Sequence, residues 1–339
     1  MADSITGAIT SGNDLPQTTK DMLTSLVAGL DQTSTQASVT TMGSTMVVAG
    51  VSTDGNYHGA VVESAAPVKG VIQVGTNNST VDLPANVGIV SQGLPTATTP
   101  DAAKAYLSDL ISAALPSTST DPAVVALNAS LNKAVNQIVT ANVNPDSTVN
   151  KAVAVNVITV TDSTPAGSAP HDIVVTSNNS SDISAFVMSA VKPGNALVIG
   201  NSSNTAAVNA VIVGPGTVKV SGNAPALIIG DAGGNQVFQG GTGSDTLVGG
   251  GGSDTLIGGS GTDTFGFNAG GQYVIKQLSV GDSFQFNIPG ITNFNQLSAL
   301  VTGTVVQNGT TTYSFVGGST ITLVGITPDQ ITANLIHFG

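Results

Sequence analysis

Three consecutive nine-residue units between residues 240 and 266 decide the fold. Residues 240–248 read GGTGSDTLV, residues 249–257 read GGGGSDTLI and residues 258–266 read GGSGTDTFG. Every unit has glycine at positions 1, 2 and 4, aspartate at position 6 and an apolar residue at position 8. The alternative is a flexible glycine-rich linker, but a linker has no reason to keep an apolar residue at position 8. The units therefore indicate a repeating structure.

Each position of the unit has a physical role. Glycine permits the positive φ values of a tightly curved loop whose carbonyl groups point inward. The residue at position 8 lies on a short strand and fills the core, so we expect Leu247, Leu256 and Phe265 to be buried. Ca²⁺ takes six to eight oxygen ligands. Such loops offer carbonyls and one carboxylate each, which predicts Ca²⁺ as the cofactor.

The units resemble the repeats-in-toxin (RTX) family of calcium-binding proteins, whose nonapeptide is glycine-glycine-x-glycine-x-aspartate-x-apolar-x. The resemblance is strong over residues 240–266 and extends loosely to Gly230. In that family two units make one turn of a parallel β-roll, and loops that are two units apart share a calcium ion. The resemblance therefore implies that Asp245 is paired with Asp263.

The resemblance places Asp254 on the opposite side of the roll, where its neighbours two units away are Gln236 and Gln272. Residues 230–235 read GDAGGN and look like a degenerate earlier unit with one inserted residue. That unit offers an aspartate or an asparagine instead, so we predict one complete calcium site and one or two partial ones. The predicted metal-binding residues are Gly241, Gly243, Asp245, Gly250, Gly252, Asp254, Gly259, Gly261, Asp263, Asp231 and Asn235.

The rest of the chain is predicted to be mainly β with a small helical part. Apolar residues at helical spacing predict a short helix over residues 22–30 and, after two capping signals, a helical hairpin over residues 99–140. Alternating β-branched residues predict short strands, among them Val81–Ile89, and the segment Pro328–Ile336 is predicted to be helical. The expected domains are an N-terminal α+β domain at 1–195, a β-solenoid with the β-roll at 196–270 and a C-terminal β region at 271–339.

Composition excludes several classes of function. The chain has 339 residues and a net charge of −12, and its eight lysines are scattered, so we expect no nucleic-acid partner. Cysteine is absent, which excludes disulfides and a catalytic cysteine. The sequence contains no run of about 18 apolar residues, so we expect no transmembrane segment. The single glutamate, Glu63, has no histidine at metalloprotease spacing and no Gly-x-Ser-x-Gly motif occurs, so we expect no enzyme.

The expected location is outside the cell or at its surface. The first Lys is Lys20, so no basic segment precedes an apolar stretch as in a cleaved signal peptide. The resemblance instead implies export by type I secretion machinery, which reads a signal in the C-terminal region, followed by calcium-driven folding outside. The leading hypothesis is a structural protein that self-assembles into a surface layer, filament or biofilm matrix. The alternatives are an adhesin or ligand-binding module with a roll, and a secreted hydrolase, which only analogy supports.

Overall fold

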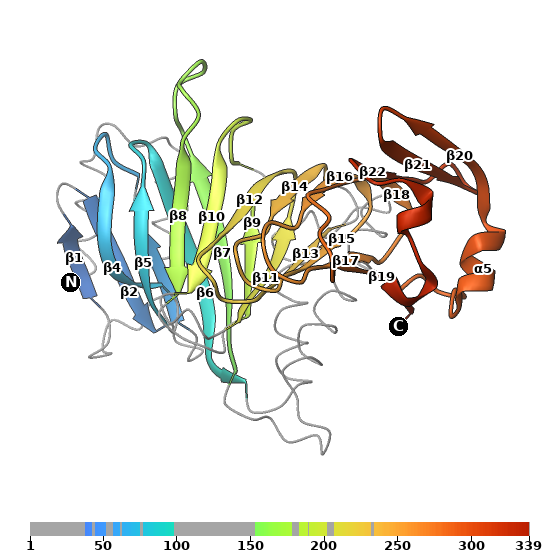
Figure 1. Cartoon of the computed structure of the whole chain (residues 1–339). Coiled ribbons are helices and arrows are strands. Elements are labelled where there is room, and N and C mark those ends of the chain that lie inside the picture. The colour runs from blue at the N-terminus through green and yellow to red at the C-terminus, as the bar shows by residue number, and fades with distance from the viewer. Residues whose placement is uncertain are drawn as a thin grey trace.

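The computed structural model describes residues 38–97 and 153–338, apart from short gaps. These gaps are residues 43–44, 52–56, 62, 75–76, 178–182, 189, 202–206 and 232–233. Within the described residues the chain forms a β-solenoid of two facing sheets (Figure 1). The predicted mainly β class is confirmed, whereas the helices predicted at 22–30 and 99–140 lie outside the described residues.

Successive strands of the solenoid alternate between the two sheets. One sheet contains, in spatial order, β1 (Ser38–Met42), β2 (Thr45–Val51), β3 (Tyr57–Val61), β6 (Val87–Ala97), β7 (Val153–Asp162), β9 (Ile183–Val187), β11 (Val208–Val213), β13 (Ala226–Gly230), β15 (Thr246–Gly249), β17 (Thr264–Phe267), β19 (Ser283–Phe286) and β23 (Ile336–Phe338). The other contains β20 (Val301–Gln307), β21 (Thr310–Phe315), β22 (Thr320–Leu323), β18 (Gly271–Lys276), β16 (Gly252–Ile257), β14 (Gln236–Gln239), β12 (Gly216–Ser221), β10 (Ala196–Asn201), β8 (Asp172–Ser177), β5 (Asn77–Leu83) and β4 (Val68–Val74).

The central strands are parallel and the strands at both ends are antiparallel. Pairing is parallel from β7 to β23 in one sheet and from β8 to β22 in the other. Antiparallel strands precede the parallel ones, and the hairpin of β20 and β21, inserted before β22, extends one sheet beyond β22 by antiparallel pairing. Both sheets continue across residue 196, where the sequence predicted a domain boundary. The boundary itself stays a prediction.

The turns of the solenoid shorten as the chain enters the nonapeptides. In the first parallel turn Val155 of β7 pairs with Ile183 of β9. In the roll Thr246 of β15 pairs with Thr264 of β17, a much shorter step along the chain. Both threonines occupy position 7 of their units, and exactly one unit lies between the units that contain them. Two nonapeptides therefore make one turn, as the resemblance implied.

The core lies between the two sheets and runs along the solenoid. The position-8 residues Leu247, Leu256 and Phe265 are all 0% exposed, so their predicted burial is confirmed. They belong to one continuous apolar cluster with the strands before and after them. At the C-terminal end the core becomes aromatic, with the rings of Phe267 and Phe286 stacked at 4.8 Å between centroids.

Two sequence predictions differ from the structure. The single strand predicted at Val81–Ile89 is wrong, because β5 ends at Leu83 and β6 begins at Val87. Asn86 between them has a φ of 63°, a left-handed conformation that asparagine tolerates and a strand cannot contain. The segment Pro328–Ile336 contains two single-turn 3₁₀ helices, η1 (Pro328–Gln330) and η2 (Ala333–Leu335), and its last residue begins β23.

One α-helix, α5 (Phe294–Ala299), was not predicted. Asn293 caps it, since its side-chain Oδ1 accepts the N–H of Gln296 at 3.0 Å. Of its residues Leu297 is buried. In the described part of the chain, no helix has the length and apolar character needed to span a bilayer.

Candidate calcium-binding site

Loops of successive turns stack on one side of the roll and bring Asp245 and Asp263 together. The backbone N–H of Asp245 donates to Asp263 Oδ1 at 2.8 Å. The same contact recurs on either side of this pair. The N–H of Ala226 donates to Asp245 Oδ1 at 2.8 Å, and the N–H of Asp263 donates to Asp282 Oδ1 at 2.7 Å. The three aspartates therefore form a buried column, each at most 2% exposed.

Asp282 is a member of this column that sequence analysis missed. It occupies position 6 of a unit that has lost the glycines at positions 1, 2 and 4, because residues 277–285 read QLSVGDSFQ. The remaining signal is an aspartate about one turn of the roll after Asp263, followed two positions later by the core residue Phe284. The register pairs Phe284 with Phe265, as expected for equivalent positions.

Asp254 lies on the opposite side of the roll, as the resemblance implied. Its Oδ1 accepts the N–H of Gln236 at 3.0 Å. The neighbour in the next turn is Tyr273 rather than Gln272, because the register of β16 and β18 pairs Asp254 with Tyr273. The Tyr273 hydroxyl donates to the carbonyl of Ala269 at 2.7 Å. A phenol thus takes the position of a carboxylate and ends the column of acidic residues on this side.

Of the two substitutes predicted in the degenerate unit, Asp231 is buried and Asn235 is exposed. The Asp231 carboxylate accepts the N–H of Gly214 at 2.5 Å and the N–H of Gly234 at 2.6 Å. Its negative charge acts on Asp254, so the two carboxylates are neighbours. Asn235 Oδ1 instead accepts the N–H of Ser253 at 3.2 Å. Their roles as ligands stay predictions.

The glycines of the loops let backbone carbonyls approach the next turn. A Cβ atom on Gly259 would lie 2.3 Å from the Gly241 carbonyl oxygen, and one on Gly261 would lie 2.2 Å from that of Gly243. Gly259 and Gly261 also have φ values of +100° and +120°. On the other side, a Cβ on Gly252 would lie 2.4 Å from a carbonyl oxygen, and one on Gly250 would lie 2.2 Å from another. Only glycine leaves these oxygens room.

Three buried oxygens in these loops accept no hydrogen bond in the described part of the chain. They are Asp254 Oδ2, Asp263 Oδ2 and Gln236 Oε1. The two ion pairs of the described residues, Lys69 with Asp82 and Lys219 with Asp172, lie elsewhere. A buried carboxylate without a partner is costly, and a bound cation removes that cost.

The pKa values of the carboxylates reflect the same lack of positive charge. Burial raises the pKa of Asp254 to about 7, and the charge of Asp231 adds to the effect. Burial raises the pKa of Asp263 to about 6, and the charges of Asp282 and Asp245 add to it. Burial also raises the pKa of Asp245, against hydrogen bonds from Gly241 and Ala226. These loops therefore hold acidic groups that ionise reluctantly without a cation.

The chemistry of the available donors fits Ca²⁺. Among the described residues no three His, Asp or Glu side chains are arranged so that they could hold one metal ion, so a cation here would take most of its ligands from backbone carbonyls. Carbonyl and carboxylate oxygens are the ligands that Ca²⁺ prefers, and its flexible geometry suits them. The loops would supply these oxygens from two successive turns at once. These features define a calcium-binding parallel β-roll.

Comparison with known families agrees with this class. Residues 230–265 match the model of the RTX calcium-binding nonapeptide repeat, in four copies. The match begins at Gly230, so it includes the degenerate unit predicted before Gly240. Residues 230–265 are thus similar to RTX calcium-binding repeats, and Ca²⁺ is the cation that these repeats bind. No curated protein matches the chain.

Proposed function

We propose that this protein is a secreted calcium-binding structural protein that self-assembles into an extracellular surface layer, filament or matrix and acts without catalysis. Proteins with RTX repeats are typically secreted, which supports an extracellular location. The same resemblance supports export by type I secretion machinery in an unfolded state. The partners in this proposal are that machinery during export and further copies of the chain afterwards.

Calcium-driven folding follows from the electrostatics of the loops. At neutral pH the stacked carboxylates of Asp245, Asp263 and Asp282 repel one another and are shielded from water. The strands between the loops are short, since β15 and β17 have four residues each. Calcium binding therefore contributes directly to folding of the roll. Low calcium inside the cell keeps the segment unfolded, and higher calcium outside folds it.

One edge strand is the observation that carries the assembly proposal. β20 lies at one edge of its sheet, and its sequence VTGTVVQ contains no charged residue and no proline. Val305 and Val306 on this strand are 60% and 52% exposed. Edge strands normally carry charges, prolines or bulges that prevent pairing with another chain. Apart from an irregularity near its start, β20 presents an apolar edge on which a strand of another copy can pair.

Electron microscopy with and without calcium tests the proposal. We expect ordered polymers of the full chain in millimolar calcium and dispersed particles in chelator. Val305→Lys places a charge on the edge and should abolish the polymers. Val280→Lys is the matched control, because Val280 is fully exposed in the turn before β19, a strand of the other sheet.

Circular dichroism of each variant in calcium separates assembly from folding. The proposal holds if Val305→Lys keeps the calcium-dependent spectrum of the native chain and remains dispersed. The assembly proposal is refuted if the native chain remains entirely as dispersed monomers at millimolar calcium. It is also refuted if both lysine variants form polymers equally.

A further inference from the structure

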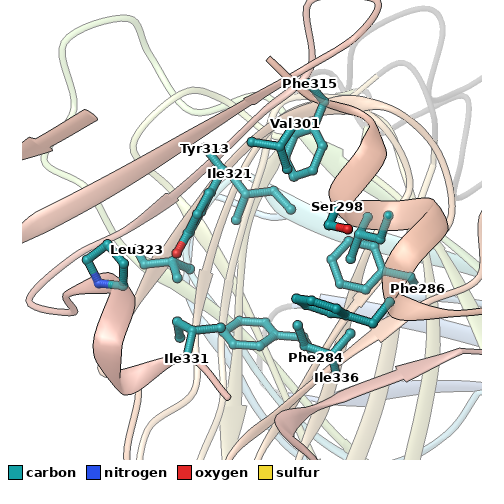
Figure 2. Close-up of a pocket in the computed structure, with 13 residues that line it drawn as sticks. Phe284, Phe286, Ser298, Val301, Tyr313, Phe315, Ile321, Leu323, Ile331 and Ile336 are labelled. Atoms are coloured by element: carbon teal, nitrogen blue, oxygen red, sulfur yellow. The ribbon is translucent and has the colours of Figure 1, made fainter. Parts of the chain in front are cut away.

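An apolar pocket of about 520 Å³ lies at the C-terminal end of the solenoid (Figure 2). It is enclosed by β19 and β23 of one sheet, β20 to β22 of the other, helix α5 and the turn at η1. The lining residues that matter below are Phe284, Phe286, Ser298, Val301 and Tyr313. The labelled side chains surround an open centre in the close-up, with Phe284, Phe286 and Ile336 along one side and Val301 and Phe315 along the other.

The pocket exists because the last turn of the solenoid departs from the short repeat. Phe265 of β17 pairs with Phe284 of β19, which in turn pairs with Ile336 of β23 after a far longer stretch of chain. The inserted residues form α5 and the hairpin of β20 and β21, and Leu297, Tyr313 and Phe315 of this insertion pack against the core cluster. Protein interiors are normally packed without voids of this size. A bound ligand would therefore complete the packing at this end of the core.

The chemistry of the lining selects the occupant. Among the described residues, no charged side chain lines the pocket, and the polar side chains that line it are Ser298 and Tyr313. The Ser298 hydroxyl already donates to the carbonyl of Asn295 at 3.0 Å. Burial raises the pKa of Tyr313, so its hydroxyl is uncharged at neutral pH. Ligand pockets of about 300–1,000 Å³ are typically apolar with a few polar groups, and this lining lies at the apolar extreme.

The pocket is open to water where its lining residues are exposed, and one such mouth lies at α5. Phe294 and Ser298 are on this helix, both line the pocket, and Phe294 is 45% exposed. A polar head group would therefore remain in water at the mouth while the apolar part enters. From the volume, the lining and the mouth we infer that the pocket binds a single aliphatic chain, such as the acyl chain of a fatty acid or lipid. This site is separate from the calcium loops and does not depend on assembly.

Isothermal titration calorimetry of the calcium-loaded full chain with dodecanol and with laurate tests the inference. We expect saturable binding of one molecule per chain, with a negative heat-capacity change from apolar burial. Ser298→Phe fills the mouth and should weaken both ligands by about tenfold or more, a loss that corresponds to one buried contact. Ala299→Phe is the control, since Ala299 is exposed on the same helix but does not line the pocket.

The outcomes distinguish binding in the pocket from non-specific binding to an exposed apolar surface. If Ser298→Phe loses the calcium-dependent circular dichroism signal and so fails to fold, Ser298→Leu replaces it, because leucine is a smaller side chain that still fills part of the mouth. The inference is overturned if the native chain gives no saturable heat. It is also overturned if both phenylalanine variants weaken binding equally. Cosedimentation with phosphatidylcholine vesicles tests the lipid source. Vesicle binding without binding of the soluble chains would assign the contact to exposed apolar residues and also overturn it.

Discussion

Asp263 shows at the scale of one residue why the roll needs a cation. One carboxylate oxygen accepts the N–H of Asp245, whereas Oδ2 is buried without a hydrogen-bond partner among the described residues. Asp254 on the other side has the same arrangement. In each case the hydrogen bond fixes the carboxylate in position and leaves one oxygen for a ligand from outside the chain.

Asp263→Asn should weaken calcium binding and stabilise the calcium-free roll. The substitution removes a negative ligand, and the number of charged ligands tunes calcium affinity, so we expect the midpoint of a calcium titration to rise by about tenfold. It also removes a buried charge, so the variant should show more β signal than the native chain by circular dichroism in chelator at pH 8. Asp329→Asn is the control, because Asp329 is exposed in η1. An unchanged midpoint would show that Asp263 is not a ligand.

The raised pKa values predict how stability depends on pH without calcium. Asp254 and Asp263 have pKa values of about 7 and about 6 in the fold, above their ordinary value of 3.8. The protonated forms are therefore favoured by folding. Their contribution to stability is complete below about pH 4 and is lost as the pH rises through 6 and 7. Circular dichroism in chelator should therefore show more β signal at pH 5 than at pH 8, and the opposite order would refute the burial of these carboxylates.

At the scale of an element, the loops depend on close backbone stacking as well as on positive φ. Gly261→Ala combines both problems, with a φ of +120° and a Cβ 2.2 Å from the Gly243 carbonyl oxygen. Gly309→Ala is the matched control, because Gly309 has a φ of +71° but nothing lies near its Cβ.

The control should cost about 1–2 kcal/mol, the ordinary cost of a left-handed conformation. Gly261→Ala should prevent calcium-dependent folding of the roll. Urea unfolding in about 5 mM calcium, a concentration above the range of extracellular calcium modules, measures both variants. Equal losses of stability would show that the loops do not stack as closely as described.

The sequence was informative where each residue type had one possible reason to be present. The glycines at positions 1, 2 and 4 and the residues at position 8 predicted a repeating structure and the burial of Phe265, and the resemblance to the RTX family implied the two-unit turn. Asp282 could not be found in the same way, because the glycines around it have been replaced while the backbone still follows the loop. Helix α5 has six residues and depends on the Asn293 cap and on tertiary packing. The turn at Asn86 was missed because Val81, Val87 and Ile89 fit a strand pattern, although Pro84 and Asn86 are residues typical of turns.

At the scale of the whole molecule, the two sheets transmit order along the solenoid. Every turn buries its apolar face against its neighbours, and one core cluster extends from Val61 to Leu323. In such stacked architectures stability is close to a sum of turns and of their nearest-neighbour interfaces. Calcium bound in the loops of 230–265 therefore stabilises the turns on both sides of the roll as well as the roll itself.

Circular dichroism of the full chain during a calcium titration, starting from chelator at pH 8, tests the central claim most directly. Calcium-driven folding predicts a cooperative gain of β signal with a midpoint of about 0.1–1 mM, the range of extracellular calcium modules. Magnesium at the same concentration should have little effect, because it demands a rigid octahedral site and gives up its water reluctantly. A spectrum that stays unchanged up to about 10 mM calcium, well above that range, would contradict the account.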